Sequence, residues 1–200
     1  MTTDLSSEYH EALDRSLERL ASRCQPGGFW RGRLCSSPLG TAVAISALLT
    51  VPRPEHRPWI EAGFEWLCRT QNPDGGWGDT PGGPGNTAAT LLVLAAAHLD
   101  HRQTLPAFVR ARRWVDGVVG PEPADWPARL LEVYEGDRTF AVPILVTCAL
   151  AGLVRWQAVP PLPFELAALP RFLWRRLRLH VVSYALPALI GIGVLLHRHA

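Results

Sequence analysis

The aspartates are the side chains best suited to acid–base chemistry in this sequence, and they are scattered rather than paired. General acid–base catalysis needs a carboxyl group held by neighbours that tune its pKa. Each of these aspartates stands alone near a predicted turn, where such residues commonly cap helices. We therefore predict no catalytic residue and expect caps or solvent-facing groups at Asp74, Asp79, Asp116, Asp125 and Asp137.

The sequence gives equally little support for metal binding or nucleophilic catalysis. His98 and His101 are spaced i,i+3 at a predicted helix end, which would suit two zinc ligands, but no third ligand accompanies them. The sequence has no G-x-S-x-G elbow and no phosphate-binding glycine loop. The sequence therefore predicts no metal site and no cofactor. Without a C-x-x-C pair, we expect buried apolar thiols at Cys24, Cys35, Cys68 and Cys148.

One stretch, residues 62–79, would hold the elements around it in place. It reads AGFEWLCRTQNPDGGWGD. Its first half looks like the last turns of a helix, which Pro73 ends because the residue before a proline is pushed out of the α region. Residues 71–79, the central turn, are then rich in glycine and contain Trp77. A Gln amide donates and accepts hydrogen bonds, so we expect Gln71 to bridge two helix ends with Trp77 stacked over its amide.

The central turn is repeated about 47 residues earlier. The segment CQPGGFWRG carries Gln25, Gly28 and Trp30 in the same order, and Trp30 and Trp77 are 47 residues apart. Apolar helices are predicted at 40–50, 87–99 and 137–153, and more polar helices at 8–24, 59–70 and 105–119. A period of about 40–50 residues with two helices per unit indicates stacked hairpins. We therefore predict an all-α fold of repeated helical hairpins that form part of an α/α toroid.

The spacing around the central turn resembles the QW motif of the triterpene cyclases, the family of squalene–hopene and oxidosqualene cyclases. That motif runs small residue, aromatic, aliphatic, three residues, Gln, three residues, Gly, one residue, Trp. The matching residues are Ala62, Trp66, Leu67, Gln71, Gly75 and Trp77, with the shortened copy at Gln25, Gly28 and Trp30. Glu61 departs from the pattern, which often has a basic residue at this position.

We predict two regions, residues 1–153 with the QW-type repeats and residues 154–200 with a proline-rich link and an apolar helix. The link is similar to one in the N-terminal half of squalene–hopene cyclases, with matches at Pro160, Pro161, Pro163, Glu165, Leu169, Pro170 and Arg171. The apolar residues 181–196 are too few to span a bilayer comfortably. Three alternatives stay open: a buried helix without its partners, a segment on a membrane surface beside basic residues, and a spanning anchor.

Members of the resembled family start cyclisation by protonating an alkene or epoxide with an Asp of a D-x-D-D motif, which lies in their C-terminal half. This motif is absent from the chain. The resemblance therefore implies the N-terminal portion of a squalene/hopene-type cyclase of hopanoid biosynthesis, inactive alone. Its expected partners are a polyprenoid such as squalene and a missing C-terminal half, and Phe140 is a candidate for lining the cavity.

Other functions remain open, as does whether this chain is itself an enzyme. It could be a standalone isoprenoid- or partner-binding toroid module, or a non-functional truncation. The net charge of +2 argues against nucleic acid. The N-terminus has no apolar run after a basic start, so we expect a cytoplasmic protein, either free or peripheral on the inner face of a bacterial membrane.

Overall fold

The computed structural model describes residues 3–32, 34–161 and 186–199. These residues form helices, turns and one isolated β-bridge between Cys24 and Trp30, with no strand among them. The all-α prediction is confirmed. The chain divides into two compact units, Met1–Cys35 and Ser36–Ala200, whereas the boundary predicted between residues 153 and 154 stays a prediction.

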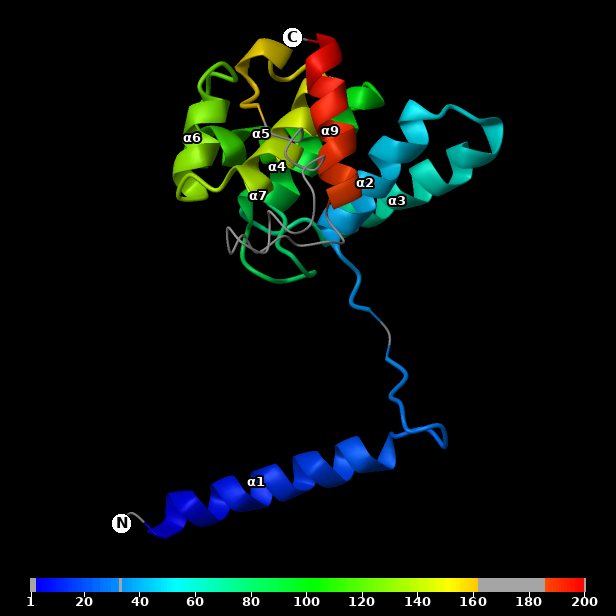
Figure 1. The fold of residues 1–200 in the computed structure, drawn as a ribbon, viewed down its shortest axis with the longest axis vertical. Coiled ribbons are helices and arrows are strands. Elements are labelled where there is room, and N and C mark those ends of the chain that lie inside the picture. The colour runs from blue at the N-terminus through cyan, green and yellow to red at the C-terminus, as the bar shows by residue number, and fades with distance from the viewer. Residues whose placement is uncertain (1–2, 33, 162–185, 200) are drawn as a thin grey trace, which may run out of the picture. The chain divides into compact units, whose positions relative to one another are not determined.

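The N-terminal unit is one long helix followed by a turn (Figure 1). Helix α1 (Thr3–Ser22) begins earlier than the predicted residue 8. Its apolar side chains fall on one face, as the helical spacing predicts, and all of them are exposed: Tyr9, Leu13, Leu17 and Leu20. The turn after α1 is closed by the Cys24–Trp30 bridge.

The second unit consists of helical hairpins (Figure 1). Its helices are α2 (Pro38–Thr50), α3 (Arg57–Thr70), α4 (Thr87–Leu99), α5 (Pro106–Val118), α6 (Trp126–Val133), α7 (Arg138–Leu150) and α9 (Leu186–His199). Two short 3-10 turns, η1 (Pro54–His56) and η2 (Trp156–Ala158), complete the described part. The predicted apolar helices correspond to α2, α4 and α7. Helix α6 was not predicted. The predicted link from residue 162 to 171 and the start of the apolar run, residues 181–185, lie outside the described residues.

The three apolar helices begin in the same way, at a polar residue whose side chain caps the helix. The Ser37 hydroxyl accepts a hydrogen bond from the Gly40 N–H, and the Asn86 side chain accepts one from the Ala89 N–H. Asp137 accepts one from the Thr139 N–H at the start of α7. Each cap satisfies a backbone donor that has no partner within the helix. The caps therefore mark equivalent points of three repeats.

Helix α4 is the centre of the second unit. It packs against α2, α5 and α7, and residues 88–97 are all buried. A helix that is apolar on every side is stable in water only when neighbours surround it. This explains why residues 87–99 read as uniformly small and apolar, and it makes α4 the helix against which the central turn folds.

Candidate functional site

Trp77 fixes the central turn from inside the core. Its side chain is fully buried, and its indole Nε1 donates a hydrogen bond to the Leu67 carbonyl oxygen at 2.9 Å. Its backbone N–H donates to the Thr90 hydroxyl at 3.0 Å, which ties the turn to α4. The indole is stacked on Phe108, with ring centroids 6.4 Å apart. The expected stack of Trp77 over the Gln71 amide stays a prediction.

Gln71 connects the central turn to the next repeat. Its Nε2 donates hydrogen bonds to the carbonyl oxygens of Gly75 at 2.8 Å and Ala107 at 2.7 Å. Its Oε1 accepts a hydrogen bond from the Arg110 guanidinium. Gln71 directly follows α3, while Ala107 and Arg110 belong to α5. Gln71 therefore joins the end of α3 and the central turn to the first turns of α5, while the bridge predicted between two consecutive helix ends stays a prediction.

Asp74 and two glycines fit the central turn onto Trp114 of α5. The Asp74 carboxylate accepts hydrogen bonds from the Gly76 N–H at 2.9 Å and from the Trp114 Nε1 at 3.2 Å. A Cβ placed at Gly76 or Gly85 would lie 2.9 Å or 2.8 Å from the Trp114 ring. Gly75 has a φ of 95°, a conformation that glycine adopts at little cost. The turn therefore requires glycine for both its path and its contact with α5.

The remaining QW residues lie on α3 and differ in burial. Leu67 is fully buried, Trp66 is half-buried against the core, and Ala62 is exposed. Leu67 presents its side chain to the core and its carbonyl oxygen to Trp77. The motif residues thus lie together around one turn, where they position helices and contact no reactive group among the described residues.

The N-terminal copy repeats the backbone of the central turn. Trp30 Nε1 donates to the Leu20 carbonyl oxygen at 2.7 Å, ten residues earlier, as Trp77 does to Leu67. Gly28 has a φ of 75°. The Gln25 N–H bonds to the Phe29 carbonyl as the Asn72 N–H bonds to the Gly76 carbonyl. This register places Gln25 opposite Asn72, so that Cys24, not Gln25, stands where Gln71 stands in the central turn.

Trp126 is a third member of this tryptophan series that the sequence analysis missed. It lies 49 residues after Trp77, is fully buried, and donates from Nε1 to the Gly120 carbonyl oxygen at 2.8 Å. The Arg112 guanidinium lies over its ring, 5.0 Å from the centroid. Its spacing was a usable signal, but the missing glycine-rich turn concealed it.

A network of four charged residues connects α3 to the end of α4. Arg57 binds both carboxylate oxygens of Asp100, at 2.6 and 3.1 Å. Arg102 binds Asp100 at 2.6 Å and Glu61 at 2.5 Å, and its guanidinium lies 4.6 Å from the centre of the Phe64 ring. Glu61, the departure from the family pattern, is thus a partner of two arginines.

The charges of this network shift the pKa values of its acids downward. A hydrogen bond from Arg102 is the main cause that lowers the pKa of Glu61. Burial alone would raise the pKa of Asp100, but hydrogen bonds from Arg57 and Arg102 outweigh it, so that the pKa is lowered. Both acids therefore stay ionised at neutral pH. Through these arginines they hold α3 to the end of α4.

The aspartates examined for acid–base chemistry have structural partners, apart from Asp125. Asp79 accepts from the Asn86 side chain, and Asp116 pairs with Arg112 at 2.7 Å. Asp74 and Asp137 accept hydrogen bonds from backbone N–H groups, as described above. Asp125 is the N-cap residue of α6, with no side-chain cap bond.

His101 forms the end of α4 rather than a metal site. It has a φ of 56°, and the N–H groups of His101 and Arg102 bond back to the carbonyls of His98 and Ala97. This is the Schellman arrangement that ends many helices. Burial lowers the pKa of His98. Among the described residues, no three His, Cys, Asp or Glu side chains gather closely enough to hold a metal ion.

The expectation of buried cysteines was wrong for three of the four. Cys148 is buried in α7, and burial raises the pKa of its thiol to about 12. The exposed thiols are Cys24, Cys35 and Cys68. They lie in the N-terminal turn, in the segment before α2, and on the outer side of α3. The small, apolar nature of the cysteine side chain therefore did not lead to burial at these three positions.

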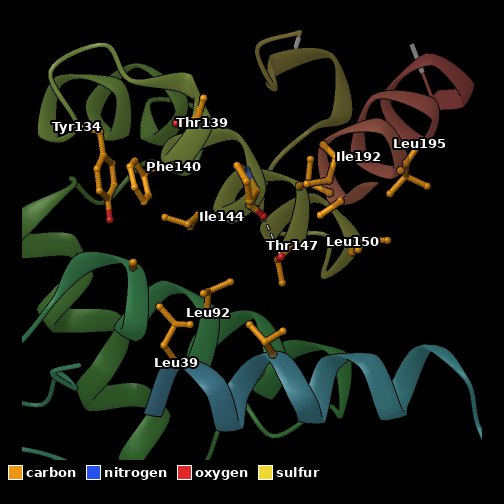
Figure 2. A pocket seen from close by; sticks show the side chains of 16 residues that line it. Leu39, Leu92, Tyr134, Thr139, Phe140, Ile144, Thr147, Leu150, Ile192 and Leu195 are labelled. Carbon is orange, nitrogen blue, oxygen red and sulfur yellow. Dashed lines mark hydrogen bonds between the residues drawn. The ribbon is translucent and has the colours of Figure 1, made fainter. Parts of the chain in front are cut away.

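An apolar pocket of about 590 Å³ lies between α2, α4, α7 and α9 (Figure 2). Phe140, the predicted candidate for cavity lining, is one of its lining residues and stacks on Tyr134 with centroids 6.2 Å apart. Figure 2 shows this aromatic pair at one end of the pocket and Ile192 and Leu195 of α9 at the other. The other lining residues are mostly aliphatic: Leu39, Val43, Ala88, Leu92, Pro143, Ile144, Val146, Leu150, Ala188 and Gly191.

Three side chains bring hydroxyl groups to this pocket. Thr139 bonds to Asp137 at 2.6 Å, and Thr147 bonds to the Pro143 carbonyl at 3.0 Å. Burial, and after it the charge of Asp79, raise the pKa of Tyr134, which therefore stays a neutral hydroxyl. The pocket offers apolar surface and aromatic faces, and its described lining residues include no carboxylic acid. These residues can contact a hydrocarbon chain but supply no carboxyl group to protonate it.

Helical hairpins joined by QW-type turns around an apolar hollow define the N-terminal part of a cyclase-type α/α toroid. The profile of the squalene-hopene cyclase N-terminal domain matches residues 13–199. The chain therefore belongs to the squalene-hopene cyclase N-terminal domain family and is a distant homologue of the class II terpene cyclases. The resemblance drawn from the sequence is confirmed.

Several curated proteins are similar to the chain. The squalene–hopene cyclase of Alicyclobacillus acidocaldarius subsp. acidocaldarius is 37% identical over 193 residues, 95% of this chain and 27% of that protein. The enfumafungin synthase of Hormonema carpetanum is 30% identical over 200 residues, 98% of this chain and 14% of its own length. The ent-copalyl diphosphate synthase of a Streptomyces species is 28% identical over 72% of this chain. No solved structure matches the chain.

The chain spans 14% to 28% of the length of these relatives. In the described part of the chain, no helix is both long enough and apolar enough to cross a membrane.

Proposed function

We propose that this chain is the N-terminal portion of a squalene/hopene-type triterpene cyclase and encloses a polyprenoid such as squalene during hopanoid-type biosynthesis. The apolar pocket is the observation that carries this proposal. Its volume of about 590 Å³ lies within the range of about 300–1,000 Å³ typical of ligand sites. The stacked rings of Tyr134 and Phe140 offer π faces that can stabilise a carbocation.

The chain's part in the reaction is to supply a wall and to exclude water, not to supply the acid. An alkene is a very weak base, and its protonation needs a strong, positioned acid. The chain has no D-x-D-D sequence, and the pocket has no carboxylic acid among its described lining residues. A C-terminal half that carries the acid is therefore the expected partner.

Squalene binding tests whether the apolar pocket of this chain forms a wall of the substrate cavity. The chain should bind radiolabelled squalene delivered from detergent micelles, and Phe140→Arg should abolish binding because it places a charge beside the apolar surface. Phe140 is 63% exposed, so the variant is expected to fold. Trp59→Arg is the matched control, since Trp59 is 72% exposed and lies outside the pocket. Equal loss in both variants, or no binding by the unmodified chain, contradicts the proposal.

Product analysis tests the missing acid. The chain incubated alone with squalene should give no hopene by gas chromatography and mass spectrometry, and hopene formation would contradict the assignment. The coding sequence after codon 200 should be read in all three frames. A frame that continues into further QW repeats and a D-x-D-D acid supports a portion of a larger cyclase.

The second candidate function is a standalone isoprenoid- or partner-binding module. It would use the same apolar pocket, whose described lining residues come mainly from α2, α4, α7 and α9. A stop codon followed by unrelated sequence, together with squalene binding, would support the module over the cyclase portion.

We also propose that the chain is peripheral to a membrane surface through α9. Ile190 and Val194 are exposed one turn apart and do not line the pocket. The last turn of α9 carries His197, Arg198 and His199, and basic groups beside apolar ones favour anionic lipid. Liposome binding should fall when both apolar residues are changed to Asp, and Val118→Asp on α5 should leave it unchanged. Equal binding by all variants would remove this contact.

A further inference from the structure

A second, polar recess of about 460 Å³ adjoins the apolar pocket. Tyr134 lines both spaces. The adjacent residues Thr87 and Ala88, at the start of α4, line the recess and the apolar pocket respectively. The recess is lined further by the segment 83–86 and by Asp79. The two spaces therefore meet at the aromatic end of the apolar pocket.

The Tyr134 hydroxyl is a polar group left available at this junction. The hydroxyls of Thr139 and Thr147 already bond to Asp137 and to the Pro143 carbonyl. Within the described part of the chain, the Tyr134 hydroxyl forms no hydrogen bond, while its ring is held against Phe140. Figure 2 shows the hydroxyl pointing toward the side of the pocket on which Leu39 and Leu92 lie. A half-buried hydroxyl of this kind can donate to a ligand atom.

The charge at the recess selects among polar ligands. One Asp79 oxygen accepts a hydrogen bond from the Asn86 side chain at 3.1 Å, which leaves the other oxygen as an acceptor. A carboxylate repels phosphate and carboxylate groups but accepts a hydrogen bond from a neutral hydroxyl. An alcohol oxygen can accept from Tyr134 and also donate to Asp79, which neither a hydrocarbon nor a diphosphate can do.

We propose that this site prefers a polyprenoid that ends in a neutral alcohol, with its chain in the apolar pocket and its hydroxyl between Tyr134 and Asp79. The inference rests on the proposed polyprenoid-binding function and specifies its substrate class. It predicts a preference for the alcohol over a hydrocarbon of equal length, because the hydrogen bond from Tyr134 alone contributes ~1 kcal/mol, a factor of about five in affinity, and the hydrogen bond to Asp79 adds to it.

The test compares three ligands of equal chain length by titration calorimetry from the same detergent micelles: geranylgeraniol, the hydrocarbon that lacks its hydroxyl, and geranylgeranyl diphosphate. The alcohol should bind at least about fivefold more tightly than the hydrocarbon. The diphosphate should bind about tenfold more weakly than the alcohol, and Asp79→Asn should recover much of this loss.

Tyr134→Phe keeps the stack on Phe140 and removes only the hydroxyl, so it should weaken binding of the alcohol about fivefold and leave the hydrocarbon bound as before. The double variant Tyr134→Phe/Asp79→Ala removes both hydrogen-bond partners of the alcohol and should equalise the alcohol and the hydrocarbon. Tyr9→Phe on α1 is the matched control and should keep the preference. Equal binding of alcohol and hydrocarbon by the unmodified chain, or a preference that Tyr134→Phe leaves unchanged, overturns this inference alone. Failure of all three ligands to bind would instead overturn the proposed polyprenoid-binding function.

Discussion

Replacing Gln71 by Met tests whether the central turn stabilises the fold through the next repeat. Met keeps the length and flexibility of the side chain but removes its amide. The amide makes three hydrogen bonds, two donated to the carbonyls of Gly75 and Ala107 and one accepted from Arg110. Each contributes about 0.5–1.5 kcal/mol to stability. Because Gln71 is half-buried and Arg110 can be hydrated after the change, we expect a loss of about 2–3 kcal/mol.

The measurement is urea unfolding followed by tryptophan fluorescence, with thermal unfolding as a second probe. A loss of about 2–3 kcal/mol corresponds to a fall in Tm of roughly 5–10 °C in a chain of this size. The matched control is Gln25→Met, because the Gln25 amide donates one long hydrogen bond of 3.3 Å to the Arg23 carbonyl and is solvent-exposed. Its expected cost is below about 0.5 kcal/mol. Equal effects in the two variants would refute the reasoning that Gln71 acts between repeats.

Three further predictions concern charge, thiol and packing. The contribution of Asp100 to stability should be constant above about pH 5 and be lost below about pH 4, because the carboxylate, whose pKa is lowered, stabilises the fold only while it is ionised; Asp100→Asn should remove this part of the fall in acid melts. Native protein should react with maleimide at three thiols, with Cys148 labelled only after unfolding, as its burial and raised pKa require; mass spectrometry counts the adducts. Gly85→Ala should cost about 1–3 kcal/mol through its clash with Trp114, whereas Gly117→Ala, in open space on α5, should be neutral or stabilising by up to ~1 kcal/mol. A Gly85 variant as stable as the Gly117 variant would contradict the packing argument.

The sequence predicted the features that depend on residues close together in the chain. The apolar periods of the sequence placed the apolar helices within a few residues, and Asn86, directly before α4, caps it. The turn chemistry of residues 71–79 was also accessible, because Gly75 and Trp77 have local reasons for their types. Helix α6 was not predicted, because its eight residues are too few to show a recognisable apolar period.

What the sequence could not predict depends on contacts between repeats. The partners of Gln71 lie 36 and 39 residues away on α5, and nothing local identifies Ala107 or Arg110 as those partners. The same holds for the pairing of Arg57 with Asp100, 43 residues apart. The apolar pocket was anticipated at Phe140 alone, because its walls come from four helices whose mutual packing fixes which side chains meet.

The tryptophan series shows which part of the repeated unit is physically essential. Leu20 and Leu67 lie among the last four residues of α1 and α3, where backbone carbonyls lack an intrahelical donor. Trp30 and Trp77 each supply an indole N–H to that carbonyl, ten residues on. In the third unit Trp126 donates to the carbonyl of Gly120, two residues after the end of α5 and six before Trp126, although both the Gln and the glycine-rich turn are gone. An indole near a helix end can satisfy a backbone carbonyl and cover it with apolar surface, so it can be kept when the turn is lost. The spacing of tryptophans is therefore a better guide to these repeats than the Gln and Gly positions that define the motif.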